Sequence, residues 1–190
     1  MTQKRVLIDV GHGYYDAPPE GHPTWDNGAL GQDGLTEFQV NMLTATVVQQ
    51  TLQLSGHYAA FVPFGLQLFQ RGAFARDFDV FLSIHHNASE TKRAQGAEVC
   101  VHRSLGNDAD TALAFAIAKR VAGALGIKDR GVAPANLAVL RGARSTNVKV
   151  ALLTEGFFLD SITATQARDW ARPEGLAIAG AVNQALQSPL

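Results

Sequence analysis

The chain has 190 residues, of which 46% are hydrophobic and 17% are charged, and its formal net charge is −1. These values are ordinary for one globular domain, and the near-zero charge excludes a global field that would attract nucleic acid or an anionic membrane. The single cysteine, Cys100, excludes an internal disulfide bond, and its alternating apolar neighbours indicate a small buried side chain.

The first residues, MTQKRVLIDV, show neither the apolar core nor the cleavage site of a signal peptide. No apolar run approaches the roughly 20 residues of a membrane span. We therefore expect a monomer that is synthesised in the cytoplasm without a signal peptide, does not insert stably into a membrane and does not bind nucleic acid.

Short apolar runs alternate with helical patterns along the chain. Strands are predicted at residues 5–10, 58–63, 80–84, 97–101, 137–140 and 148–154. Apolar residues spaced three and four apart, together with Gly and Pro punctuation, predict helices at 36–54, 66–77, 108–125 and 173–187. This alternation predicts a single α/β domain over residues 1–190, with a mixed, mostly parallel sheet of about six strands and helices on both faces. The Gly- and Pro-rich segment 13–34 is predicted to be a long loop, either functional or mobile.

Three predicted strands are followed at once by reactive side chains. His12 follows the first strand, His85 follows the strand VFLSI, and Glu155 follows the last strand. Ligands of open α/β sheets bind beyond the carboxyl ends of the strands, so we expect these three side chains to share one site.

A fourth candidate lies at the start of a helix. Thr36 and Gln39 have the spacing of a capping box, which makes Glu37 the first helical residue. Two histidines and one carboxylate, with a further position open to water, form a common catalytic zinc site. His12, Glu37 and His85 are therefore candidate metal ligands, and Glu155 is a candidate acid/base that moves protons between water and a leaving amine.

Each of these features has a simpler interpretation. A Gly-His-Gly turn is often only a turn, and a glutamate in the first turn of a helix usually serves the helix dipole, for about 0.3–1 kcal/mol. A histidine after a strand is commonly a hydrogen-bonded loop residue. The sequence also lacks HExxH, paired CxxC and GxSxG motifs, so better-known hydrolase signatures are absent.

Other polar residues are less strong candidates. Because successive strand residues face opposite ways, His86 should point away from His85, which leaves it a supporting role or a substrate contact. His22 lies in the long loop and could reach substrate, while His57 and His102 are predicted at the surface.

Two further residues have predicted structural roles. Arg71 is expected to pair with an acidic group such as Asp79, and Asp9 either orients a ligand or accepts hydrogen bonds in its turn. Asn87 is a further candidate for substrate contact.

Four segments together resemble one known family. They are VLIDVGHGYYD, NGALGQDGLTEFQVN, FDVFLSIHHNAS and RGVAPANLAVLRGARSTNVKVALLTEGFFLD. The chain resembles the zinc-dependent N-acetylmuramoyl-L-alanine amidases of the amidase-3 type, found in autolysins, sporulation hydrolases and phage endolysins. It departs from the family pattern at Val10, Tyr14 and Asp160.

The resemblance implies one Zn²⁺ held by His12, Glu37 and His85, with Glu155 as catalytic acid/base. It also implies a peptidoglycan substrate, cut at the amide between the lactyl group of N-acetylmuramic acid and the L-alanine of the stem peptide. The enzyme would then act on the bacterial cell wall, as a phage or prophage endolysin released by host lysis or as an autolysin. The short segment HRSLGND implies that no inserted helix blocks the site.

Other functions fit the same residues. A zinc exopeptidase or deacylase on a related fold would use the same metal on another bond. A non-catalytic wall-binding module would keep the fold without the chemistry, although the presence of Glu155 argues against it. A structural zinc protein would need a fourth strong ligand.

Overall fold

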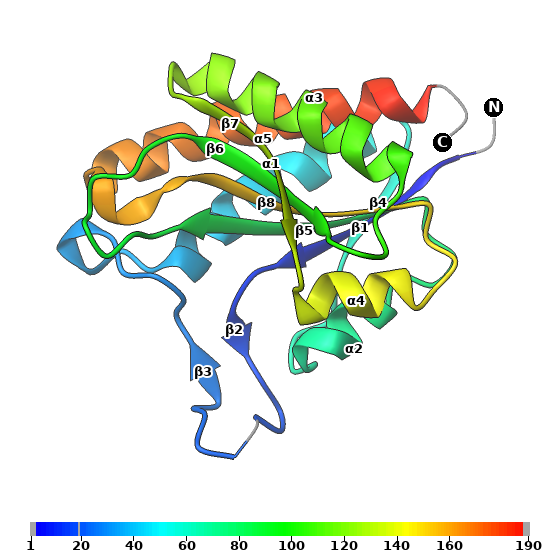
Figure 1. The fold of residues 1–190 in the computed structure, drawn as a ribbon, viewed down its shortest axis with the longest axis horizontal. Coiled ribbons are helices and arrows are strands. Elements are labelled where there is room, and N and C mark those ends of the chain that lie inside the picture. Colours follow the sequence, from blue (N-terminus) through cyan, green and yellow to red (C-terminus); the bar gives the residue numbers. More distant parts are fainter. Residues whose placement is uncertain (1–2, 19, 188–190) are drawn as a thin grey trace.

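The computed structural model describes residues 3–18 and 20–187, which form a six-stranded sheet covered by helices (Figure 1). The strands are β1 (Arg5–Val10), β4 (Tyr58–Phe61), β5 (Val80–Asn87), β6 (Ala97–His102), β7 (Asp129–Ala135) and β8 (Val150–Phe158). Their order is β4-β1-β5-β8-β6-β7, and all neighbours are parallel except β6 and β8. The predicted mixed, mostly parallel sheet is thus confirmed.

Two helical layers bury the two faces of this sheet. The helices are α1 (Glu37–Leu54), α2 (Leu68–Ala73), α3 (Asp108–Leu125), α4 (Ala138–Arg144) and α5 (Ala164–Leu186). The long helices α1, α3 and α5 pack together over one face, and the short pair α2 and α4 covers the other (Figure 1). In the short pair, a Cβ on Gly72 would overlap the carbonyl of Val139, so glycine allows the two helices to approach closely.

The predicted strand at 137–140 is wrong, because these residues lie at the start of helix α4. A run of four apolar residues suits a helix as well as a strand, and here Leu140 and Ala143 face the core from one side of the helix. The actual strand is β7, which the sequence hid because it contains Gly131 and Pro134. β7 is the last strand of the sheet, where proline is tolerated.

Several other boundaries differ from the predictions; the predicted helix 66–77, for example, is the shorter α2, Leu68–Ala73. Helix α5 begins after its N-cap Thr163 and passes through Pro173, which was expected near its start. Strands β5 and β8 continue to Asn87 and Phe158, so His85 and Glu155 lie within strands and do not follow them. None of the described helices is long and apolar enough to cross a membrane.

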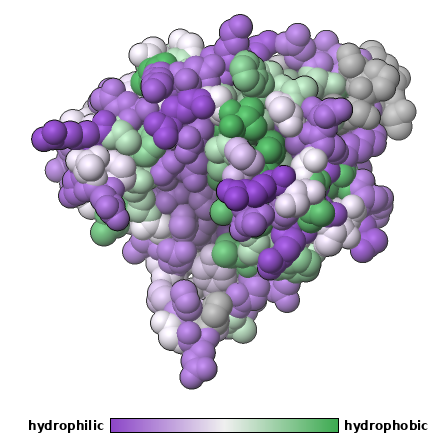
Figure 2. Space-filling model, in the orientation of Figure 1, coloured by the Kyte–Doolittle hydropathy of each residue, from purple (hydrophilic) through white to green (hydrophobic). Residues whose placement is uncertain are grey.

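The long segment between β1 and α1 holds a two-stranded antiparallel ladder, formed by β2 (Gly13–Tyr14) and β3 (Trp25–Asp26). We call residues 13–18 and 20–26 the arm, because they project from the body of the domain (Figure 1). Figure 2 shows mostly hydrophilic residues over this projection. The segment also contains a short 3-10 helix, Gln32–Gly34, before α1.

Candidate functional site

The Gly-His-Gly turn brings His12 against His85 at the carboxyl ends of β1 and β5. His12 has a left-handed backbone, with φ 69°, and Gly13 follows with φ 93°. A Cβ on Gly11 would overlap the imidazole of His85, so this position has to be glycine for the two rings to meet. The ring centroids of His12 and His85 are 4.9 Å apart.

Glu37 lies between the two histidines at the first position of α1. The predicted capping box is present, with Thr36 as N-cap and Gln39 completing it. Glu37 Oε2 lies 3.0 Å from His12 Nε2, and Glu37 Oε1 lies 3.0 Å from His85 Nδ1. The carboxylate is 4% exposed, so its charge is held inside the protein rather than in solvent.

His12, Glu37 and His85 can hold a metal ion together. Each offers one donor atom, and these atoms all lie within 4.8 Å of one another. Two imidazole nitrogens and one carboxylate oxygen suit zinc and leave coordination positions open to water or substrate. A Cβ on Gly28 would overlap Glu37 and His12, so the chain also leaves room around these donors. The residues present therefore fit the metal that the sequence implied. We call these three residues the donor cluster.

The pKa values of the donor cluster favour an ionised carboxylate beside the two histidines. Burial alone would raise the pKa of Glu37, but hydrogen bonds from His12 and His85 hold it far below its ordinary value. Burial alone would lower the pKa of His12, but Glu37 and Asp26 raise it to about 9. In the metal-free protein near neutral pH, His12 therefore carries a second ring proton.

Sequence reasoning missed Asp26, which the arm places behind His12. Asp26 Oδ2 accepts a hydrogen bond from His12 Nδ1 at 2.8 Å, and this leaves Nε2 facing Glu37. A carboxylate on the second nitrogen fixes the tautomer and the ring orientation of a ligating histidine. Only the pairing of β2 with β3 brings Asp26 to His12, so no sequence spacing revealed this contact.

Glu155 lies directly beside the donor cluster, because β8 pairs it with His85 in the sheet register. Its Oε2 atom is buried and has no hydrogen-bond partner within the described part of the chain. Burial raises the pKa of Glu155 to about 8, and the negative charges of Glu37 and Glu98 act in the same direction. The structure therefore brings together all four predicted site residues.

Arg71 supports the turn and pairs with an acidic group as predicted, but this group is Asp9 and not Asp79. Its buried guanidinium contacts Asp9 at 3.3 Å and donates to the carbonyls of Val10 and His12. Asp79, just before β5, instead pairs with Lys149, whereas Arg71 reaches the carboxyl end of β1. Arg71 and Asp9 thus fix the backbone on either side of the Gly-His-Gly turn.

The remaining histidines differ in their burial and in their hydrogen-bond partners. His86 is 1% exposed and points away from His85, as its strand position predicts. His102 was predicted at the surface, but it is buried and its Nδ1 accepts from two backbone amides in the turn after β6. His57 is half-buried and bonds to Asn183.

Two cavities meet beside the donor cluster. One of about 150 Å³ is lined by His12 and His85, and one of about 470 Å³ lies between the arm and α2, with His22 on its wall. Four residues line both cavities: Tyr15, Asp26, Leu68 and Ala138. A groove thus leads from the arm to the donor cluster, whereas Asn87 lies elsewhere and donates to Glu98.

The fold and the donor cluster define an α/β domain with a candidate metal centre at the carboxyl ends of its central strands. A family model described as N-acetylmuramoyl-L-alanine amidase, Amidase_3, matches residues 6–187. The chain belongs to this family.

Individual relatives agree with this assignment. N-acetylmuramoyl-L-alanine amidase LytC of Bacillus subtilis (strain 168) is 32% identical over 155 residues, which are 79% of this chain but 29% of LytC. The chain therefore spans less than a third of the length of this relative. The catalytic domain of CwlV from Bacillus (Paenibacillus) polymyxa is 27% identical with a TM-score of 0.80, covering 98% of this chain and 100% of that one. AmiC2 of Nostoc punctiforme is 26% identical with a TM-score of 0.80, covering 97% and 98%.

Proposed function

We propose that this chain is a zinc-dependent peptidoglycan hydrolase that cleaves the amide between the lactyl group of N-acetylmuramic acid and L-alanine. The observation that carries the proposal is the position of Glu155 beside the three-residue donor cluster, with a buried Oε2 atom that has no hydrogen-bond partner among the described residues. Membership of the amidase family supports the choice of bond. Two catalytic components would thus stand side by side, one for a metal and one for protons.

His12, Glu37 and His85 would hold the zinc ion, which when bound polarises the scissile carbonyl and lowers the pKa of water. Glu155 Oε2 takes a proton from the attacking water and then delivers it to the leaving amine of L-alanine. In the metal-free protein burial raises the pKa of Glu155 to about 8, and a bound cation would favour the carboxylate form that accepts the proton from water. Arg71 and Asp9 keep the histidine turn rigid during these transfers.

We further propose that substrate reaches the site without an activator, as in an endolysin or autolysin acting on the cell wall. Residues 103–107, all of them described, form a turn and an extended stretch between β6 and α3, with no helix over the donor cluster. If turnover on purified wall required an added protein, this part of the proposal would fail.

The direct test is mass spectrometry of the products released from purified peptidoglycan, with a chelated sample as control. Free stem peptides that begin at L-alanine, next to intact glycan strands, would support the proposal. Cuts inside the peptide would instead indicate a zinc exopeptidase, and loss of an acyl group a deacylase. Binding to the wall without any product would indicate a wall-binding module. Re-addition of zinc should restore the chelated sample.

Asp26→Asn should weaken zinc binding by about tenfold, because the oriented tautomer of His12 loses its carboxylate partner. The dissociation constants should be compared at several pH values, because Asp26 also raises the pKa of His12 and its loss changes the competition from protons. Asp16→Asn is a suitable control, because Asp16 lies in the arm but contacts neither histidine of the donor cluster. Equal zinc affinity of Asp26→Asn and the wild type would contradict the assigned role.

Zinc affinity should rise with pH between about pH 6 and pH 8. In the metal-free protein the pKa of His12 is raised to about 9, so across this range zinc has to displace a proton. Displacing one proton changes the affinity by about tenfold per pH unit, and the affinity falls as the solution becomes more acidic. A competition titration at several pH values measures this slope, and a flat profile would refute it.

A further inference from the structure

A second polar cluster lies beneath the donor cluster, on the face of the sheet that α1 and α5 cover. His86 and Glu174 are 1% and 0% exposed. His86 Nε2 lies 2.8 Å from Glu174 Oε2, and the Thr44 hydroxyl donates to the same oxygen at 2.9 Å. These three residues come from β5, α5 and α1, so the cluster ties three elements together. The proposed mechanism uses none of them.

The hydrogen bonds fix the protons of this cluster. The Asn41 amide nitrogen donates to the carbonyl of Gly11 at 3.1 Å, so its oxygen faces His86 Nδ1, at 2.7 Å. His86 Nδ1 must therefore carry a hydrogen, while Nε2 and Glu174 Oε2 hold one further proton between them. With both ring nitrogens engaged, the imidazole of His86 is held in one orientation.

The cluster contacts the donor residues at two points. The backbone N–H of His86 donates to Glu37 Oε1 at 3.1 Å, and this is the oxygen that faces His85. Asn41 holds the carbonyl of Gly11, the residue before His12. The backbone of His86 therefore contacts Glu37 directly, and its ring is linked to the Gly11–His12 turn through Asn41.

A third contact reaches the strand that carries Glu155. His85 pairs with Glu155 and Asn87 with Phe158, so His86 alone lies opposite Gly156 and Phe157, a β-bulge in β8. A Cβ on Gly156 would overlap Glu174 Oε1, which shows that the carboxylate fills the space at this bulge.

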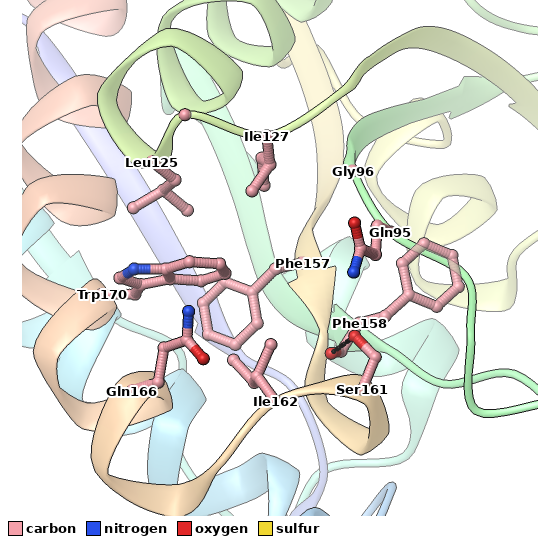
Figure 3. Close-up of a pocket in the computed structure, with 11 residues that line it drawn as sticks. Gln95, Gly96, Leu125, Ile127, Phe157, Phe158, Ser161, Ile162, Gln166 and Trp170 are labelled. Atoms are coloured by element: carbon pink, nitrogen blue, oxygen red, sulfur yellow. Dashed lines mark hydrogen bonds between the residues drawn. The ribbon is translucent and has the colours of Figure 1, made fainter.

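An aromatic wall closes the cluster on its outer side. The Phe157 ring lies 4.2 Å from the His86 ring and 5.4 Å from that of Trp170. In Figure 3, Phe157 and Trp170 stand together at the edge of a cavity of about 270 Å³. The cluster is therefore shielded from this cavity by packed rings.

Burying the carboxylate of Glu174 costs folding free energy. Glu174 Oε1 is buried and has no hydrogen-bond partner in residues 3–18 and 20–187. Replacing a buried ion pair by well-packed apolar residues is often neutral or stabilising, so stability alone does not account for Glu174.

We propose that His86 and Glu174 are positioning residues that hold Glu37 and the Gly11–His12 turn in ligating geometry, and so set the metal affinity of the site. The inference rests on the proposed function only in taking zinc as the metal. Outer partners of metal ligands typically change affinity by about 10–100-fold when they are removed.

The test measures zinc dissociation constants of metal-stripped proteins at one fixed pH, by competition with a chromophoric chelator. Glu174→Ala should bind zinc about 10–100-fold more weakly. Glu174→Gln should recover most of the affinity, because its amide can still bond to His86 and Thr44. Asp110→Asn is the matched control: Asp110 is also 0% exposed, but it bonds to Ala151 at the other end of β8. It should lower stability and leave zinc affinity unchanged.

A double variant, His86→Leu with Glu174→Leu, separates positioning from stability. We expect it to unfold at no lower denaturant concentration than the wild type but to bind zinc more weakly, and its cobalt(II) form to show shifted visible absorption bands. Wild-type zinc affinity and an unchanged cobalt spectrum in both the double variant and Glu174→Ala would overturn the inference. A wild-type protein that binds no zinc would instead refute the proposed function, and this inference with it.

Discussion

Glu155→Gln should reduce the release of stem peptides from peptidoglycan by about 10²–10⁴-fold, which is the usual contribution of a positioned acid/base. Zinc should remain bound at one ion per chain, because Glu155 is outside the donor cluster. The amide keeps the shape of the side chain but can no longer exchange the proton. Single-turnover kinetics and metal analysis of the same sample measure both effects.

The same variant should not destabilise the fold. Burial raises the pKa of Glu155 to about 8, so the folded protein binds a proton that the unfolded chain releases above its ordinary pKa. This difference costs stability as the pH rises from the ordinary value towards 8, and glutamine removes it. Denaturant unfolding of the metal-free proteins near neutral pH should therefore show Glu155→Gln at least as stable as the wild type.

Glu98→Gln is the matched control for Glu155→Gln. Glu98 pairs with Glu155 across β6 and β8, yet its carboxylate is bound to Arg130 and Asn87. This variant should keep turnover within a few-fold of the wild type. If Glu155→Gln also retained near-normal turnover, Glu155 would have no role in proton transfer.

His85→Ala should abolish both zinc binding and turnover. The variant leaves two protein donors, His12 and Glu37, and removing a direct ligand should weaken zinc binding by more than the roughly 10–100-fold typical of outer partners. Equilibrium dialysis against a chelator followed by metal analysis measures the loss, and peptide release should fall to background.

His57→Ala provides the comparison for His85→Ala. His57 is a half-buried histidine just before β4 that bonds to Asn183 of α5, and no donor-cluster residue contacts it. It should retain one zinc and normal turnover. A zinc content of His85→Ala equal to that of His57→Ala would show that His85 is not a ligand.

The sequence predicted those parts of the molecule in which one local rule dominates. The capping box set the start of α1, and therefore Glu37, before any tertiary contact was considered. Buried runs such as VFLSI identified the central strands. The pleat alone placed His85 and His86 on opposite faces. These features depend on a few neighbouring residues, so they can be read from the chain.

Other parts depended on contacts between distant segments and could not be predicted. Asp26 reaches His12 only because a short ladder forms in a segment without periodicity. Arg71 meets Asp9 across 62 positions in the chain, whereas Asp79 was the nearer acidic candidate in sequence. β7 was hidden by Gly131 and Pro134, which an edge position accommodates. In each case a tertiary arrangement overrode the local signal.

The arm has a consequence for how this domain can be altered. Its ladder contains only two residue pairs, and one of them joins Gly13, next to His12, to Asp26. The arm therefore both lines the groove and supplies Asp26, which holds the His12 ring. Grafting an arm from another hydrolase to change substrate preference would also change the donor cluster unless the graft keeps an aspartate at position 26. Any exchange of the arm therefore has to keep the four ladder residues, Gly13, Tyr14, Trp25 and Asp26.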